Sequence, residues 1–433
     1  MKNNYFCLKI FISFVFFFLM VRYLYADDTF DILVNDDSRQ AEQLNPRVAV
    51  NYAGEFVVTW ADKRNGRSEI FFQYFDSAGT PLGFNQKIAG YSVSAPQYAS
   101  ALDANQLGQF GTVWSDYRNG SYPFNPDIYY SAIDINGPGT NSSITGARPD
   151  SSCESPDIAV LPGGNIIIVW ADRRGQSWDI YGQLLSANGT TIGNNFRINS
   201  EDGQSQQHSP RVAAISDGRF IVVWYDNRSG DDDIYGRLFD PNGNPMAPDF
   251  RVNDDDGQTK QAFPAVAADG NGRYFIAWVD WRNGTYPKNP DIYYRRYDNT
   301  GMPLGECHQL VADADRRPQK DVAICSDRMG NLGLVWADST SGEWDVMAQI
   351  IDNVGAVAGS KFLIHLETDG KQLQPDIATD GYKFFLVWAD SRRGDFDIYV
   401  TIKNFNDPTI VSEPGRLRFN MQEGEEVPAS QTI

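Results

Sequence analysis

The chain has 433 residues, of which 42% are hydrophobic and 13% aromatic, and it contains 38 Gly and 22 Pro. This composition fits many short strands joined by tight turns and excludes a disordered chain. The formal net charge of −19 disfavours nucleic acid as a partner, because binding to a phosphate backbone needs clustered Lys and Arg.

Residues 1–26 have the features of a secretory signal peptide. Lys2 and Lys9 precede or flank the apolar run 11–21, and residues 24–26, Leu-Tyr-Ala, form a suitable cleavage site. We therefore expect a secreted, extracellular or cell-surface protein. An uncleaved N-terminal anchor is the alternative; no later stretch reaches the roughly 18 apolar residues that a membrane span needs.

One phrase recurs seven times along residues 27–405. It consists of an apolar run that ends in Trp, an Asp two residues later, usually an Arg and a Gly, and then Asp-Ile-Tyr. The seven Trp residues, spaced 52 to 58 residues apart, are Trp60, Trp114, Trp170, Trp224, Trp278, Trp336 and Trp388. A repeat of this period that is built from strands indicates a β-propeller or a solenoid.

The third repeat predicts the content of one unit. We expect strands at 156–160, 166–170, 179–185 and 196–199, separated by Gly-rich turns and an Asn-Gly hairpin. The run 166–170, Ile-Ile-Ile-Val-Trp, is apolar throughout, which is typical of a strand buried on both faces. Four antiparallel strands in one repeat correspond to one propeller blade.

The two ends of the repeat region predict how the ring closes. The last repeat lacks its outermost strand, and residues 31–35 before the first repeat resemble the outer strand of the fourth. We predict an all-β, seven-bladed propeller of four-stranded antiparallel blades whose N-terminal strand completes the last blade. We also expect a small residue at one fixed point of each innermost strand, at Ala49, Ala99, Ala159, Ala213, Ala267, Ala323 and Ala378.

The Asp-x-Arg turns gather on one face of the predicted propeller. They are Asp62/Arg64, Asp116/Arg118, Asp172/Arg174, Asp226/Arg228, Asp280/Arg282 and Asp390/Arg392, and Asp338 has Thr340 in place of Arg. A single active site needs each residue once, so these copies indicate scaffold. We expect each Asp to cap its own turn and each Arg to pair with a neighbouring acid.

Repeats two and five share a four-residue expansion between the Arg and Asp-Ile-Tyr, at 118–126 and 282–290. We expect these loops to stand across the mouth of the ring from one another, with exposed aromatic side chains that suit sugar rings or peptide side chains. The hypothetical ligand-binding residues are Tyr122, Phe124, Trp281, Tyr286, Arg118 and Arg282. A duplication without function is the alternative interpretation.

Metal and cofactor chemistry has little support in the sequence. Acidic segments at 35–37, 199–203 and 253–257 leave Ca²⁺ as an alternative, but they lack the alternate Asp spacing of a calcium loop. The three His residues fall in different repeats, and no catalytic or phosphate-binding motif is present. Of the cysteines after the signal, Cys153, Cys307 and Cys325, at least one is expected to be free, and we expect Cys307 and Cys325 to lie too far apart to bridge.

The phrase Val-Trp-x-Asp-x-Arg-x-Gly-x-x-Asp-Ile-Tyr, followed by a hairpin, an Arg-Val-Asn strand and Pro-x-Ile-Ala, resembles the sialidase-like (BNR-repeat) secreted β-propellers over residues 28–405. It is also similar to TolB-type propellers. The hairpins at 76–80, 186–190 and 240–244 keep the turn of a sialidase Asp-box without its Asp and Trp, so the boxes are degenerate and no catalytic residue carries over. Residues 406–433 resemble a linker and the truncated start of a BACON or immunoglobulin-like β-sandwich domain.

These observations favour a non-catalytic binding propeller that is part of a larger extracellular protein and whose partner is a glycan or a protein. A sialidase-type glycoside hydrolase is the alternative function, and a structural spacer is a further alternative. We expect no catalytic residue, no metal and no cofactor. The sequence assigns neither the ligand nor the oligomeric state.

Overall fold

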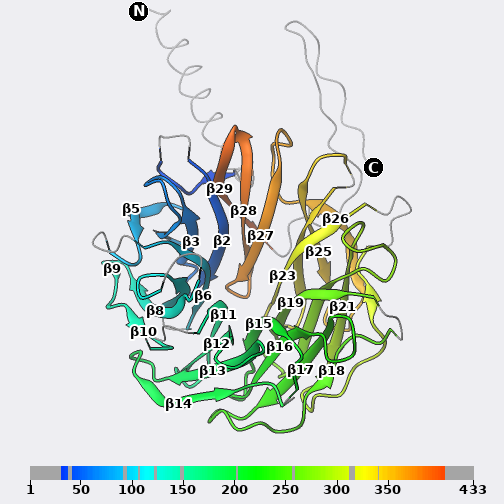
Figure 1. Cartoon of the computed structure of the whole chain (residues 1–433). Coiled ribbons are helices and arrows are strands. Elements are labelled where there is room, and N and C mark those ends of the chain that lie inside the picture. The colour runs from blue at the N-terminus through cyan, green and yellow to red at the C-terminus, as the bar shows by residue number, and fades with distance from the viewer. Residues whose placement is uncertain are drawn as a thin grey trace, which may run out of the picture.

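A computed structural model describes residues 31–37, 41–90, 95–105, 108–120, 124–146, 151–200, 203–255, 259–311, 317–339 and 341–404. Over these ranges the chain forms seven antiparallel sheets arranged as blades around a central channel (Figure 1). No helix in the described ranges is long and apolar enough to cross a membrane. The expected signal peptide and the expected start of a second domain lie outside the described residues.

Each blade is one sheet whose strands follow one another outward from the channel. Blade 1 consists of β2 (Gln43–Val50), β3 (Phe56–Asp62), β4 (Glu69–Phe75) and β5 (Pro81–Lys87). Blade 2 consists of β6 (Gln97–Ala104), β7 (Phe110–Asp116) and β8 (Asp127–Asp134), with a split outer strand, β9 (Gly137–Pro138) and β10 (Ser142–Ser143). Blade 3 consists of β11 (Cys153–Val160), β12 (Ile166–Asp172), β13 (Asp179–Leu185) and β14 (Thr191–Arg197).

The remaining blades repeat this order. Blade 4 consists of β15 (Gln207–Ala214), β16 (Phe220–Asp226), β17 (Asp233–Phe239) and β18 (Phe250–Arg251). Blade 5 consists of β19 (Gln261–Ala268), β20 (Tyr274–Asp280), β21 (Asp291–Tyr297) and β22 (His308–Gln309). Blade 6 consists of β23 (Gln319–Ser326), β24 (Leu332–Asp338), β25 (Asp345–Ile351) and β26 (Val357–Leu363). Blade 7 consists of β27 (Gln372–Thr379), β28 (Lys383–Arg393), β29 (Asp395–Asn404) and β1 (Ile32–Leu33).

The N-terminal strand closes the ring, which confirms the prediction. In β1, Ile32 pairs with Val400 and Leu33 with Tyr399 of β29. Asn35 follows, and its Oδ1 accepts a hydrogen bond of 2.7 Å from the N–H of Ile398. Figure 1 shows the outcome, with the blue N-terminal blade beside the orange β27–β29. The first and last parts of the repeat region therefore share one sheet.

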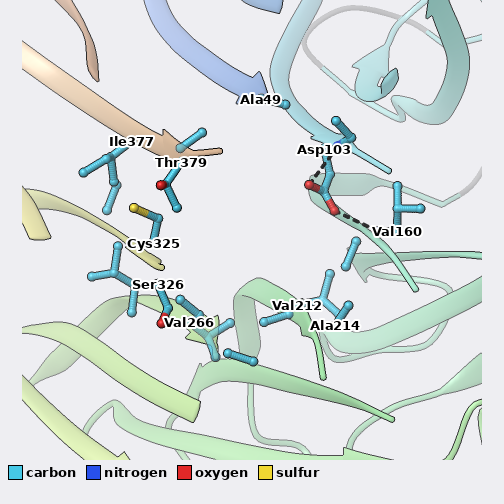
Figure 2. A pocket seen from close by; sticks show the side chains of 18 of the residues that line it. Ala49, Asp103, Val160, Val212, Ala214, Val266, Cys325, Ser326, Ile377 and Thr379 are labelled. Atoms are coloured by element: carbon cyan, nitrogen blue, oxygen red, sulfur yellow. Dashed lines mark hydrogen bonds between the residues drawn. The ribbon is translucent and has the colours of Figure 1, made fainter. Parts of the chain in front are cut away.

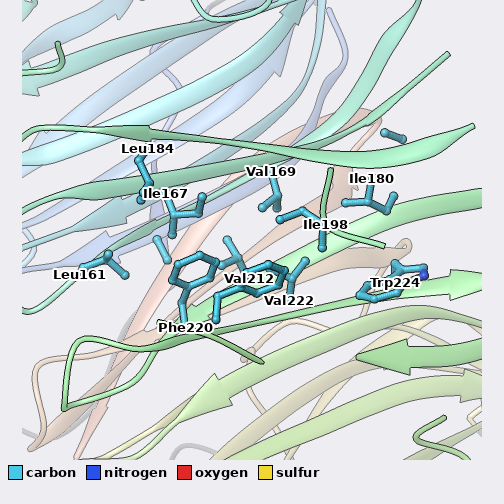
Figure 3. Close-up of a cluster of buried hydrophobic side chains, with 13 residues drawn as sticks. Leu161, Ile167, Val169, Ile180, Leu184, Ile198, Val212, Phe220, Val222 and Trp224 are labelled. Carbon is cyan, nitrogen blue, oxygen red and sulfur yellow. The ribbon is translucent and has the colours of Figure 1, made fainter. Parts of the chain in front are cut away.

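The core lies between neighbouring blades. All seven Trp side chains of the repeated phrase are fully buried, as expected of packing residues. Figure 3 shows one such layer, in which Ile167 and Val169 of β12 face Val212, Phe220 and Trp224 of blade 4. The second strands are buried along almost their whole length because each is covered by a blade on either side.

The small residue of each innermost strand is not the same in all seven blades, so this prediction was wrong for blades 2 and 6. A β-bulge shifts the register within each innermost strand, and the position that pairs like Ala49 holds Asp103 in β6 and Cys325 in β23. Opposite these two residues the second strand carries glycine, Gly111 and Gly333. The other five blades pair Ala with a bulky apolar residue.

All three described cysteines are free thiols, which confirms the expectation that Cys307 and Cys325 do not bridge. Cys325 lies in β23 beside the channel, whereas Cys307 precedes the outer strand β22. Burial raises the pKa of the Cys325 thiol, and neighbouring Asp376 adds to this effect. The fold is therefore held by packing and hydrogen bonds, with no disulfide among the residues that the structure describes.

Candidate ligand-binding site

The strand connections give the propeller two different faces. The first, which we call the Arg-turn face, carries the turns between the second and third strands, where the Asp-x-Arg residues lie, and the loops between blades. The second, the inner-hairpin face, carries the turns between the first and second strands, such as 51–55, 162–165 and 380–382. The central channel runs from one face to the other.

The Asp-x-Arg turns form a scaffold of the expected kind. In blade 3, Asp172 accepts hydrogen bonds from the indole N–H of Trp170 (2.9 Å) and from the backbone N–H of Arg174 (2.8 Å). The Arg174 guanidinium pairs with the same carboxylate and lies 3.5 Å from the centre of the Tyr181 ring. Burial alone would raise the pKa of Asp172, but the bonds from Arg174 and Trp170 hold it below its ordinary value.

Blade 6 replaces the missing arginine with a lysine from another strand. The Nζ atom of Lys361, in the outer strand β26, lies 3.2 Å from Asp338 Oδ2. The indole of Trp336 still donates to this carboxylate, at 3.1 Å. The buried carboxylate therefore keeps a cation, although nothing in the local turn sequence indicated which residue would supply it.

The expanded loops of blades 2 and 5 are anchored by equivalent asparagine hydrogen bonds. The Nδ2 atoms of Asn119 and Asn283 each donate to the Asp of the following Asp-Ile-Tyr, both at 3.1 Å, and to its Tyr hydroxyl, at 2.8 and 2.9 Å. Arg118 and Arg282 are bound by the Asp of their own turns, like the other turn arginines. These two arginines therefore belong to the scaffold, and a role in ligand binding stays a prediction.

The loop aromatics differ in exposure. Phe124 and Tyr286 are 67% and 58% exposed, as expected of ligand-binding candidates. The expectation of an exposed Trp281 was wrong: this side chain is only 6% exposed and packs edge-on against Tyr286, with ring centres 5.3 Å apart. The buried Trp281 thus packs against the exposed Tyr286 and holds its ring in place. Tyr122 lies outside the described residues.

A chain of aromatic rings lies on the Arg-turn face across blades 3 to 5. We call it the aromatic arc, and it consists of Trp178, His208, Tyr225, Phe263 and Tyr286. The first four follow one another with ring centres 5.4, 5.5 and 5.9 Å apart. Lys260 connects Tyr225 with the blade 5 loop, since its Nζ lies 5.8 Å from the Tyr225 ring centre and 4.8 Å from that of Tyr286.

Phe263 joins the aromatic arc to the channel. It occupies the bulge of β19 with a φ of 54°, is 53% exposed and lines the central cavity. A bulge redirects the side chain it carries, which here turns a large ring toward the opening of the channel. The equivalent bulge residues of blades 1, 3 and 4 are Asn45, Ser155 and Ser209, which are small or polar. The apolar surface therefore lies on one side of the opening.

The channel forms a cavity of about 860 Å³ that is lined by all seven innermost strands. Aspartates on these strands accept the backbone N–H groups that face the channel from the next blade. Asp103 accepts from Val160 (2.8 Å), as Figure 2 shows, and Asp157 accepts from Val212 (2.8 Å). Burial raises the pKa of Asp103 to about 6. These carboxylates therefore satisfy backbone N–H groups at the inner edges of the sheets, which have no neighbouring strand to accept them.

Two arginines share a small pocket at the wall of this channel. Arg47 and Arg211 line a space of about 70 Å³ together with the serines of neighbouring blades, Ser100, Ser155 and Ser209. Each guanidinium donates to the carbonyl of the preceding proline at 3.0 Å. Burial lowers the pKa of Arg211, Asp157 opposes this, and the nearby cation of Arg47 lowers it further. The pocket thus presents guanidinium and hydroxyl donors together.

The sequence carries a local signal for the arginine pair and a weaker one for the aromatic arc. The segments Pro46-Arg47 and Pro210-Arg211 occupy the same register as Pro156-Asp157 in the innermost strands. A charged side chain at a position that faces the channel indicates a role other than apolar packing. The aromatic arc had a weaker signal, because its rings come from different strands of three blades and meet only through blade packing.

No protein-family model matches this chain, and no curated protein matches it in sequence. Solved structures share its fold. A polysaccharide lyase of family PL25, an ulvan lyase solved with -[GlcA(1-4)Rha3S]-, has a TM-score of 0.55 and 10% identity over 86% of this chain and 96% of its own. The α-L-arabinanase of Penicillium chrysogenum with arabinobiose has a TM-score of 0.51 and 14% identity, over 72% and 94%.

A sialidase is a weaker structural match. NanB of Streptococcus pneumoniae, as a K499G mutant, has a TM-score of 0.48 and 10% identity over 88% of this chain and 71% of its own. At these identities the likeness concerns the propeller fold alone. The fold is therefore shared with carbohydrate-active enzymes, and the site of this chain has to be interpreted from its own residues.

Proposed function

We propose that the chain is a secreted or cell-surface binding protein that holds a glycan on its Arg-turn face. The aromatic arc carries this proposal. Sugar rings have apolar faces that stack on aromatic side chains, and the arc offers several such rings next to a large cavity with polar groups. A row of rings over three blades suits an extended chain of sugars better than a single sugar.

The arginine pair gives the proposal its chemical preference. Arg47 and Arg211 present charged donors beside serine hydroxyls in a pocket that has room for a small anionic group. Asp157, whose charge raises the pKa of Arg211, also accepts the backbone N–H of Val212. We infer that the preferred glycan carries a carboxylate or sulfate group, which enters this pocket while neighbouring sugars stack on the aromatic arc.

The fold neighbours support a glycan as the class of ligand. The ulvan lyase and the arabinanase were each solved with a carbohydrate bound. Their sequences are too different for any residue to be transferred. The support is limited to the class of ligand, and the choice of surface rests on the residues described above.

Titration of a panel of neutral, carboxylated and sulfated oligosaccharides tests the proposal. Phe263→Ala and Tyr286→Ala should each weaken binding by about 0.5–1.5 kcal/mol, roughly 2- to 12-fold in Kd. Phe84→Ala, which removes an exposed ring from the outer strand of blade 1, is the matched control. Unchanged affinity in the Phe263 and Tyr286 variants would contradict the assignment of the surface.

A second comparison separates the acidic preference from general glycan binding. Arg47→Gln and Arg211→Gln should reduce affinity for acidic ligands and leave the affinity for neutral ligands near that of the unchanged protein. The same mixtures should be examined for released products. Turnover that a single carboxylate substitution abolishes would establish a glycoside hydrolase or lyase, and a panel without any binding would favour a protein partner or a spacer.

A further inference from the structure

Three large exposed side chains lie at hairpins between the first and second strands of neighbouring blades, on the inner-hairpin face. Tyr52, Met329 and Tyr382 are 49%, 71% and 67% exposed, and they occupy the hairpin tips of blades 1, 6 and 7. The corresponding tips of blades 3, 4 and 5 carry Pro162-Gly163, Ser216-Asp217 and Gly270-Asn271. Among the described hairpins between first and second strands, those of blades 1, 6 and 7 therefore carry the large exposed side chains, while hairpins between third and fourth strands on the same face carry others, such as Met302 and Val354.

Arg328 ties these tips together into one surface. Its Cζ lies 3.9 Å from the centre of the Tyr52 ring and 5.5 Å from that of Tyr382. The side chain crosses the blade 7 hairpin at Gly381, where a Cβ would lie only 2.8 Å from Arg328 Nε. The glycine thus leaves room for a bridge from blade 6 to blade 1. We call Tyr52, Arg328, Met329 and Tyr382 the hairpin-face patch.

The chain leaves the propeller beside this patch. The last strand, β29, ends at Asn404, which pairs with Lys383, the residue that follows Tyr382. Twenty-nine residues, 405–433, come after it. At roughly 3.3–3.6 Å per residue they can extend about 100 Å, far more than the 3.9 and 5.5 Å that separate Arg328 from the Tyr52 and Tyr382 rings.

The composition of residues 405–433 complements the patch. The segment contains five acidic residues and two arginines, and apolar residues that include Ile410, Val411, Leu417 and Phe419. Arg328 is exposed and donates to the backbone carbonyl of Asp380 at 3.3 Å, and its contacts with the Tyr52 and Tyr382 rings leave N–H donors that can bind a carboxylate. The apolar residues of this segment can pack on the rings of Tyr52 and Tyr382 and on the side chain of Met329.

We propose that residues 405–433 dock on the hairpin-face patch, with apolar side chains on Tyr52 and Tyr382 and an acidic side chain on Arg328. This inference does not depend on the identity of the glycan. A second copy of the chain and a separate protein are the competing occupants, and both predict contacts between molecules.

Photo-crosslinking in the full chain distinguishes these occupants. A p-benzoylphenylalanine at position 382, which is exposed, should form crosslinks to peptides from 405–433, identified by mass spectrometry. In a mixture of isotopically labelled and unlabelled protein these crosslinks should join peptides with the same label. The same probe at position 246, on an exposed hairpin of blade 4, should give no crosslink to this segment.

Two further results decide the proposal. Arg328→Glu should lower the yield of the crosslink from position 382 roughly fivefold, because it replaces an attraction with a repulsion. A probe at 382 that forms no crosslink to 405–433, or that joins only peptides with different labels, would overturn the proposal. An unchanged crosslink yield in Arg328→Glu would contradict the proposed contact between Arg328 and an acidic side chain of residues 405–433.

Discussion

The side chain that accepts the backbone N–H of the residue after the repeated Asp of the third strand differs between blades. Asn199 accepts from Ile180, Asn253 from Ile234 and Asn35 from Ile398, each at 2.7–2.9 Å. In blade 6 this acceptor is a histidine: His365 Nε2 accepts from Val346 N at 3.2 Å, while Nδ1 lies 2.7 Å from the carbonyl oxygen of Glu367. The neutral ring with its proton on Nδ1 satisfies both contacts.

His365 should make blade 6 sensitive to acid. Burial lowers its pKa below the ordinary value, although the Glu367 carbonyl and Asp345 oppose this. As the pH falls below about 6.5, the unfolded chain therefore takes up a proton before the folded one does, and the free energy of unfolding decreases. His365→Asn, the residue of blades 3 and 4, should gain stability relative to the unchanged protein between pH 7.5 and 5.5.

Urea unfolding at both pH values measures this difference. His308→Asn, a change at an exposed histidine in β22, is the matched control and should follow the unchanged protein. If His365→Asn loses stability on acidification as steeply as the unchanged protein does, the acid sensitivity has another origin.

At the scale of single residues, the sequence predicted what is local. The repeated Trp, Asp and Arg lie within four positions of one another, so their mutual bonds follow from the turn itself. Lys361, which replaces the arginine of blade 6, is 23 residues from its Asp338 partner. Its role depends on where an outer strand ends, which no local pattern specifies.

At the scale of strands, the bulge of each innermost strand sets which residue meets which. Apolar runs and turns predicted the first three strands of the third repeat close to their observed bounds, whereas the outer strand, expected at 196–199, spans Thr191–Arg197. They could not predict the extra residue that shifts the register, and so Ala99 and Ala323 were aligned with Ala49 in place of Asp103 and Cys325. The aromatic arc depends on the same bulge, because it places Phe263 at the opening of the channel.

The glycines opposite Asp103 and Cys325 should tolerate alanine to different degrees. A Cβ at Gly333 would lie 2.5 Å from Phe384 Cε1 and 2.9 Å from Ile377, whereas at Gly111 the nearest atom, in Tyr130, is 3.1 Å away. Gly333→Ala should therefore lower the free energy of unfolding by about 1–3 kcal/mol through overpacking. Gly111→Ala should cost less, because small shifts relieve its contacts.

Chemical denaturation of both variants gives this comparison. The loss of unfolded-chain entropy favours alanine by about 0.4–1 kcal/mol at either position, so it cancels between the two. Equal losses, or a stabilised Gly333→Ala, would show that blade 7 moves away from the new methyl group at little cost.

At the scale of the whole molecule, the ring was predicted from the sequence because its two ends carry matching halves of one blade. The proposed ligand surface includes the blade 5 loop with Tyr286, which the sequence indicates as a candidate, whereas the arginine pair and the other rings of the aromatic arc were not expected from the sequence. Ring closure is a matter of repeat counting. The surface depends on neighbouring blades that bring side chains 30 and 38 residues apart into contact, as between Trp178 and His208 and between Tyr225 and Phe263.

The closing contact should differ from its equivalents in kinetics more than in equilibrium stability. Asn35 binds Ile398 across 363 residues of sequence, whereas Asn199 makes the same bond to Ile180 across 19. Replacing either by Ala leaves a buried N–H without an acceptor and should cost about 1–3 kcal/mol. A contact between distant segments pays the larger loop-closure entropy and is expected to form late in folding.

Asn35→Ala should therefore appear mainly as faster unfolding, since a contact absent from the transition state changes the unfolding rate and leaves the folding rate nearly unchanged. Asn199→Ala, within one blade, should change both rates. Stopped-flow refolding and unfolding in urea provide the measurement for the two variants. If Asn35→Ala slows folding as much as Asn199→Ala does, the ends of the chain meet before the blades are complete, and ring closure guides assembly.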